Sequence, residues 1–186
     1  MELCGFGPIV SGIRTTQLID RYSPNRVVLL GVAGALDTQH EVGSAMEFGE
    51  VICFGIGAGS GEGFLSASEM GWRQWSESPD ISDVIPLDII PLVSESNQLP
   101  GRLPLLTCCA ASANEQDVQQ RLKKHANAIA EDMEGFSVAA ACRFAGVPVR
   151  IVRGISNRAG DRNKTNWRVG DAMASAEKTI LEVLKS

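Results

Sequence analysis

Residues 127–158 read NAIAEDMEGFSVAAACRFAGVPVRIVRGISNR, and this stretch decides the fold. An apolar run at 127–132 ends in carboxylates, and a mostly apolar helical segment follows at 135–145. Gly146-Val147-Pro148 stops that helix before a second apolar run at 149–154. Strand, helix and strand in this order predict two parallel strands joined by a helix that covers them.

The alternation continues over the rest of the chain. Pro8 suits the first turn of a helix, and residues 57–63 are too rich in glycine for regular structure. The expected strands lie at 1–8 (with a turn), 26–31, 46–56, 89–93 (within irregular structure), 103–109, 127–132 and 149–154, and the expected helices at 8–21, 114–124, 135–145 and 171–185. This order predicts an α/β fold, a three-layer α/β/α sandwich with a central mixed sheet.

Length and composition fit one folded domain. The 186 residues, 44% apolar and 21% charged, are typical of a soluble globular protein. A net charge of −5 argues against a phosphate-backbone binder, so we expect no nucleic-acid partner. The apolar stretches are too short to span a bilayer and the N-terminus lacks a signal-peptide pattern, so we expect no membrane partner.

The cysteines and histidines bear on compartment and metal binding. Five cysteines at irregular spacing fit neither a disulfide framework nor a C-x-x-C metal site, and we interpret them as buried, reduced thiols of a cytoplasmic protein. His40 and His125 have no partner motif around them and are interpreted as surface or structural residues. The sequence therefore predicts no metal and no cofactor.

Two predicted strand ends are unusually polar. Glu131, Asp132 and Glu134 crowd between an apolar strand and an apolar helix, and residues 153–162 follow the next strand. In open α/β sheets, ligands bind beyond the carboxyl ends of the strands. The carboxylates fit either a helix N-terminus or a site that accepts the two adjacent hydroxyls of a ribose. The second segment is either a solvated basic loop or part of the same site.

Three motifs stand in order along the chain: EDMEG at 131–135, GVP at 146–148 and VRGISN at 152–157. Together they resemble the paired motifs of methylthioadenosine and S-adenosylhomocysteine nucleosidases, within the purine nucleosidase and nucleoside phosphorylase superfamily. Further segments are more similar to the futalosine hydrolase branch: SNRAGDR at 156–162, Trp167, GEGFL at 61–65 and GW at 71–72. Glycines in 5–8 and 31–36 also match, so the resemblance covers nearly the whole chain.

This resemblance implies roles for individual residues and a phosphorylase/hydrolase-like fold. Glu134 and Asn157 are the expected catalytic residues: Glu134 holds the ribose hydroxyls and Asn157 faces the purine. Met133 packs under the sugar, and Arg153 supports the site. The other expected substrate-binding residues are Asp132, Ser156, Gly5, Gly7, Val32, Ala33 and Gly34.

The residue at position 157 points to the base. Adenine-directed relatives use an aspartic acid there to give the base a proton, whereas Asn157 offers only an amide donor and a carbonyl acceptor. These groups suit a 6-oxopurine, whose N7 accepts and whose N1–H donates. The resemblance thus favours hydrolysis of a purine nucleoside, futalosine to hypoxanthine plus dehypoxanthine futalosine in menaquinone biosynthesis. A purine nucleoside phosphorylase or a methylthioadenosine/S-adenosylhomocysteine nucleosidase remains the alternative.

The chain departs from the superfamily at its N-terminus. The superfamily begins with further strands and a loop that supplies a glutamate for activating water, whereas this chain starts almost at its Gly-x-Gly turn. The domain at 1–186 is thus expected to lack these strands, through truncation or a late start, or to be an inactive remnant that binds nucleosides. The superfamily also forms oligomers, and Trp72 and Trp75 either serve such contacts in a homo-oligomer or fill the core.

Overall fold

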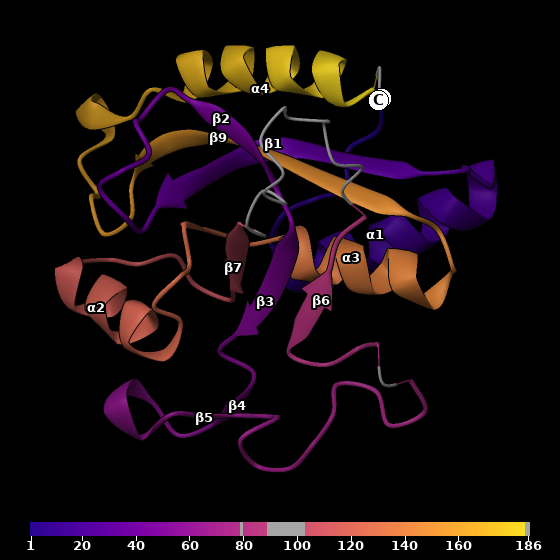
Figure 1. The fold of residues 1–186 in the computed structure, drawn as a ribbon, viewed down its shortest axis with the longest axis horizontal. Coiled ribbons are helices and arrows are strands. Elements are labelled where there is room, and N and C mark those ends of the chain that lie inside the picture. Colours follow the sequence, from indigo (N-terminus) through magenta and orange to yellow (C-terminus); the bar gives the residue numbers. More distant parts are fainter. Residues whose placement is uncertain (79, 89–102, 185–186) are drawn as a thin grey trace, which may run out of the picture.

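A seven-stranded mixed sheet with helices on both sides forms the centre of the computed structural model, which describes residues 1–78, 80–88 and 103–184 (Figure 1). The strand order is β2-β9-β1-β8-β7-β3-β6. These strands are β1 Val27–Ala35, β2 Ala45–Phe48, β3 Glu50–Phe54, β6 Val84–Pro86, β7 Pro104–Cys108, β8 Ala130–Asp132 and β9 Val149–Arg158. Parallel pairs β1–β9, β3–β7 and β7–β8 stand beside antiparallel pairs β1–β8, β2–β9 and β3–β6, which confirms the expected mixed sheet.

The helices form the two outer layers. They are α1 Gly7–Tyr22, α2 Glu115–Lys124, α3 Gly135–Phe144 and α4 Val169–Val183. In Figure 1, α4 runs along β2, β9 and β1, while α3 packs on the other side of the sheet and α1 packs against α3. A Cβ at Gly154 in β9 would lie 2.1 Å from the carbonyl oxygen of Ala172, so glycine lets α4 approach the sheet this closely.

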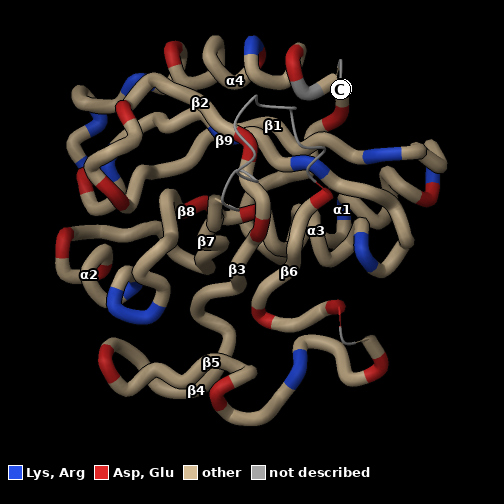
Figure 2. The backbone as a smooth tube through the Cα atoms, in the orientation of Figure 1, with Lys and Arg blue, Asp and Glu red and all other residues tan. Residues whose placement is uncertain are grey.

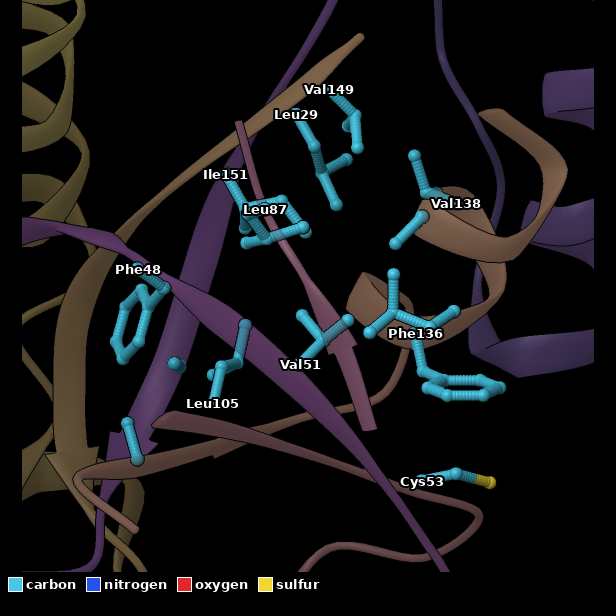
Figure 3. Packing of buried hydrophobic residues seen from close by; sticks show 14 of the residues in the cluster. Leu29, Phe48, Val51, Cys53, Leu87, Leu105, Phe136, Val138, Val149 and Ile151 are labelled. Carbon is cyan, nitrogen blue, oxygen red and sulfur yellow. The ribbon is translucent and has the colours of Figure 1, made fainter. Parts of the chain in front are cut away.

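The main hydrophobic core lies between the sheet and α3. Phe136 and Val138 from α3 belong to the same cluster of buried side chains as Val51 and Leu105 of the central strands (Figure 3). Val51 and Leu105 have no exposed surface, and burial of each such side chain contributes about 1.5–3 kcal/mol. This packing fixes the start of α3, which carries the EDMEG segment, against the middle of the sheet.

All four expected helices are confirmed within two residues at their starts and ends. The expected strand at 46–56 is instead divided at Gly49, because Ala45–Phe48 pairs with β9 and Glu50–Phe54 with β7. Residues 1–5 form no strand, since they pair with none of the described strands. The expected strand at 89–93 lies outside the described residues.

Short elements occupy the glycine-rich region that was expected to lack regular structure. β4 Gly57–Ala58 pairs with β5 Leu65–Ser66 in a separate hairpin, with the 3₁₀ turn η1 Gly61–Gly63 between them, and a second 3₁₀ turn, η2, covers Lys164–Asn166. No helix in the described parts of the chain combines the length and apolarity needed to cross a bilayer. Lys and Arg are interspersed with Asp and Glu along the chain (Figure 2).

Candidate active site

A cavity of about 1020 Å³ opens where the carboxyl ends of β8 and β9 meet β1. Every residue that the sequence assigns to the site lines it, except Gly7. Those lining residues are Gly5, Val32, Ala33, Gly34, Asp132, Met133, Glu134, Arg153, Ser156 and Asn157. The fold therefore brings the two polar segments together in one place, because Gly34 of β1 pairs with Asn157 of the parallel β9 on one side and with Glu131 of the antiparallel β8 on the other.

Glu134 presents its carboxylate to the cavity at the N-terminus of α3. Its Oε1 accepts a hydrogen bond from the backbone N–H of Gly7 at 3.0 Å, and its Oε2 lies 3.4 Å from Nη2 of Arg153. The side chain is 15% exposed. Because each carboxylate oxygen accepts up to two hydrogen bonds, both oxygens keep capacity for donors from a ligand. Gly7 thus acts on the site through Glu134 without lining the cavity.

Asp132 lies beneath this group and its carboxylate is fully enclosed. Oδ2 accepts from Nε and Nη2 of Arg153 at 3.0 and 2.5 Å and from the N–H of Gly135 at 2.9 Å, while Oδ1 accepts from the hydroxyl of Thr107 at 2.7 Å. The Asp132 side chain has 0% exposure and that of Arg153 has 3%. These four contacts tie Asp132 to Arg153, Thr107 and the start of α3, so Asp132 positions Arg153 and α3.

The guanidinium of Arg153 fits beside β1 only because residue 31 has no side chain. A Cβ on Gly31 would lie 2.0 Å from Nη1 of Arg153. This guanidinium has no freedom to move aside, because its bonds to Asp132 fix it. Glycine is therefore needed at position 31 to leave room for the ion pair of Arg153 with Asp132, and not to form a turn.

Asn157 lies near the end of β9, where it pairs with Gly34 of β1, and it is buried. Its Oδ1 accepts from the hydroxyl of Ser156 at 2.8 Å, and its Nδ2 donates to the carbonyl of Arg158 at 2.8 Å. A carboxamide nitrogen carries two N–H groups, so one N–H remains for a ligand. Ser156 therefore sets the orientation of the Asn157 amide, the group that the sequence analysis predicts to face the purine.

A second buried ion pair shapes the wall of the cavity, and sequence reasoning missed it. The Glu131 carboxylate accepts from the N–H and the hydroxyl of Ser112 at 2.8 and 2.7 Å and binds the guanidinium of Arg121 from α2. Arg121 also donates to the carbonyl of Ala110 at 2.7 Å. This network ties the loop after β7, including the cavity-lining Ala111, to β8. The one signal in the sequence was a third carboxylate at 131.

The cavity extends from these polar groups along an open edge of β1. β8 pairs with β1 only at Gly34 and Ala35, so the preceding residues of β1 have no strand partner on that side among the described residues. Residues 1–6 and apolar side chains of α1 and α4 line the same space. Burial raises the pKa of the Cys4 thiol, with Arg153 opposing that shift, so this thiol is uncharged at neutral pH.

The family model of the phosphorylase superfamily matches residues 1–186. The futalosine hydrolase of Streptomyces coelicolor is 30% identical over 156 residues, 83% of this chain and 63% of the relative. The 5′-methylthioadenosine/S-adenosylhomocysteine nucleosidase of Staphylococcus carnosus is 30% identical over 192 aligned residues, 100% of this chain and 81% of the relative. The chain thus spans less than two thirds of the length of the first relative.

Solved structures share the fold at lower identity. The 5′-methylthioadenosine/S-adenosylhomocysteine nucleosidase of Neisseria meningitidis, in complex with methylthio-immucillin-A, has a TM-score of 0.75 at 19% identity, over 98% of this chain and 79% of that chain. The nucleosidase of Colwellia psychrerythraea, in complex with adenine, has a TM-score of 0.77 at 20% identity, over 98% and 75%. The family match over residues 1–186, together with the 30% identity to the Staphylococcus carnosus relative, establishes that the chain belongs to the phosphorylase superfamily.

Proposed function

We propose that this protein hydrolyses the N-glycosidic bond of a purine nucleoside whose base is hypoxanthine, with futalosine as the substrate. The observation that carries the proposal is the pairing of a half-buried carboxylate, Glu134, with a buried carboxamide, Asn157, in one cavity. The names of the two curated relatives, a futalosine hydrolase and a nucleosidase, support the reaction class.

Glu134 supplies the contact to the sugar. Its two oxygens have free acceptor capacity, and a vicinal diol presents two donors at matching separation. Cleavage of the glycosidic bond builds positive, oxocarbenium character on the ribose, and a nearby carboxylate stabilises that charge more than it stabilises the neutral ground state. Arg153, whose Nη2 lies 3.4 Å from Oε2 of Glu134, holds the carboxylate in place.

Asn157 supplies the contact to the leaving base. N7 and O6 of a 6-oxopurine are both acceptors on one edge of the ring, and the free N–H of the Asn157 amide donates to that edge. N1 lies on a different edge, so a single amide serves N7 and O6 rather than N7 and N1. Negative charge develops on the base as the bond breaks, and a donor at N7 or O6 stabilises it.

An adenine-directed nucleosidase is the second candidate, because the relative that matches the entire chain is named for that reaction. An amide also pairs with the N7 and N6 edge of adenine, so hydrogen bonding alone does not exclude that base. The difference lies in the leaving group: adenine gains most from an acid that protonates N7, and Asn157 has no such proton to give. A phosphorylase is disfavoured, since residues 31–36 contain no arginine to bind phosphate.

The test is release of hypoxanthine from futalosine, followed by chromatography, for the wild-type chain and for Glu134→Gln. We expect turnover by the wild type and a drop of about 10- to 150-fold in kcat/KM for the variant, the loss of one charge-assisted hydrogen bond. Unchanged turnover in Glu134→Gln would contradict the assignment. If the wild type binds the nucleoside in calorimetry without releasing base, the nucleoside-binding remnant replaces the hydrolase.

We further propose that the protein works as a cytoplasmic homo-oligomer. Trp72 and Trp75 are 69% and 41% exposed, so they do not fill the core, and Trp75 stacks edge-on against the exposed Phe144 at 5.7 Å. Exposed aromatic residues are enriched in subunit interfaces. Light scattering at micromolar concentration is expected to give at least a dimer mass, which Trp72→Ser combined with Trp75→Ser lowers. A monomer mass for the wild type would contradict the proposal.

A further inference from the structure

Arg162 and Trp167 form a stacked pair on the wall of the same cavity, beyond the residues already assigned. The guanidinium carbon of Arg162 lies 5.3 Å from the centre of the Trp167 ring, and both side chains line the cavity. The indole N–H of Trp167 donates to the carbonyl of Asp161 at 3.0 Å, which fixes the ring. Arg162 is exposed and Trp167 half-buried, so the pair stands at the mouth of the cavity.

Arg162 differs from the other arginine of this cavity in its ion pairing. Arg153 faces Asp132 and Glu134. Among residues 1–78, 80–88 and 103–184, no carboxylate lies within ion-pair distance of Arg162. The adjacent Asp161 carboxylate accepts instead from the N–H of Asn163 and from the amide of Asn166, each at 2.8 Å.

Stacking leaves the hydrogen-bonding edge of Arg162 available. A guanidinium uses its face against an aromatic ring and keeps its in-plane N–H donors for a planar anion, which it binds in a bidentate manner. A carboxylate matches this edge in charge and in geometry. The indole beneath also limits the conformations of Arg162, so less side-chain freedom is lost on binding.

The position of the pair says which part of a nucleoside reaches it. The buried Asn157 and the half-buried Glu134 take the base and the ribose hydroxyls under the proposed function. The 5′ carbon then carries the remaining group of the molecule, and that group extends toward the exposed mouth. We propose that Arg162, supported by Trp167, binds a carboxylate on the 5′ substituent and selects acidic nucleosides over neutral ones. This inference rests on the proposed function of the same cavity.

The test compares two hypoxanthine nucleosides that differ in one charge: 5′-(2-carboxyethylthio)-5′-deoxyinosine and its carboxamide. Calorimetry on the 186-residue protein measures Kd for each, independently of turnover. We expect the wild type to bind the carboxylate about tenfold more tightly than the amide, the size of one charge-assisted hydrogen bond. The preference should shrink at 1 M salt, where charges near a surface are screened.

Three variants locate the source of the preference. Arg162→Gln should bind both ligands equally, and Trp167→Leu should keep the arginine but reduce the preference. The control is Arg73→Gln, an exposed arginine outside the cavity lining, which should leave the tenfold ratio unchanged. Urea midpoints of Arg162→Gln and Arg73→Gln should match the wild type, because both arginines are exposed.

Each result decides between the proposals. Equal binding of the two ligands by the wild type, or a preserved preference in Arg162→Gln, would overturn the role of Arg162. A carboxylate preference without release of hypoxanthine would support Arg162 and contradict the hydrolase. Release of hypoxanthine from both nucleosides without preference would do the reverse. Failure of the wild type to bind either ligand would overturn both.

Discussion

Asp132 and Glu134 lie two residues apart, but we propose a structural role for Asp132 and a substrate-binding role for Glu134. Replacing each by its amide separates the two roles. Asp132 is enclosed and accepts four hydrogen bonds from the protein, two of them from Arg153. Asp132→Asn removes one of the two negative charges that face the buried guanidinium of Arg153. We expect it to lower the free energy of unfolding by about 3 kcal/mol, the low end for breaking a buried pair, because Glu134 still faces Arg153.

Glu134→Gln should instead leave stability within about 1 kcal/mol of the wild type, since the side chain is partly exposed and an amide oxygen still accepts from Gly7. Its effect falls on kcat/KM. Urea unfolding followed by circular dichroism measures both variants. Asp171→Asn, at an exposed ion pair with Arg168, is the control and should change stability by less than about 0.5 kcal/mol. Equal destabilisation by Asp132→Asn and Glu134→Gln would refute the division of roles.

Two further substitutions test other parts of the structure. Gly31→Ala should lower the free energy of unfolding by about 1–3 kcal/mol and reduce activity, because its Cβ displaces Arg153; Gly63→Ala, with open space around it, is the control in the same urea and turnover assays. Burial lowers the pKa of His125 from its ordinary 6.5, so the unfolded chain binds more protons and the free energy of unfolding falls as pH drops through about 6.5. His125→Gln should flatten that part of the stability curve measured in urea at pH 5.5 and 7.5, and an unchanged slope would contradict it.

Local signals made the helices predictable. The side chain of Asn114 caps α2 by accepting from the N–H of Asp117 at 3.0 Å, and Pro8 stands in the first turn of α1. Such caps and the helical period depend on neighbours in sequence. Helices marked by these signals can therefore be predicted without knowledge of the tertiary structure.

Strand ends depended on partners that the sequence does not show. The expected strand at 149–154 continues to Arg158 because β1 pairs with it along its whole length, with a bulge at Ala33 and Gly34. Asn157 is consequently held in a strand rather than in a loop. Gly49 ends one strand and starts another because its N–H donates to the carbonyl of Leu103 and its own carbonyl accepts from Leu87.

The sequence predicted residues that the fold brings to one cavity, but it did not predict which contacts each of them makes. Spacing placed Asp132 and Glu134 together, yet only the distant Thr107 and Arg153 show that Asp132 is enclosed. The ion pair between Arg121 and Glu131 likewise joins two different elements, α2 and β8, across ten residues of sequence. Pairing of this kind is decided by packing, for which a sequence pattern carries no signal.

The base that the wild-type chain releases most directly tests the central claim. The assay compares release of hypoxanthine from futalosine and inosine with release of adenine from methylthioadenosine, and repeats both with Asn157→Asp. The account predicts that the wild type releases hypoxanthine faster, because Asn157 has no proton for N7 of adenine, and that the aspartate variant shifts toward adenine. Faster release of adenine by the unmodified protein would contradict it.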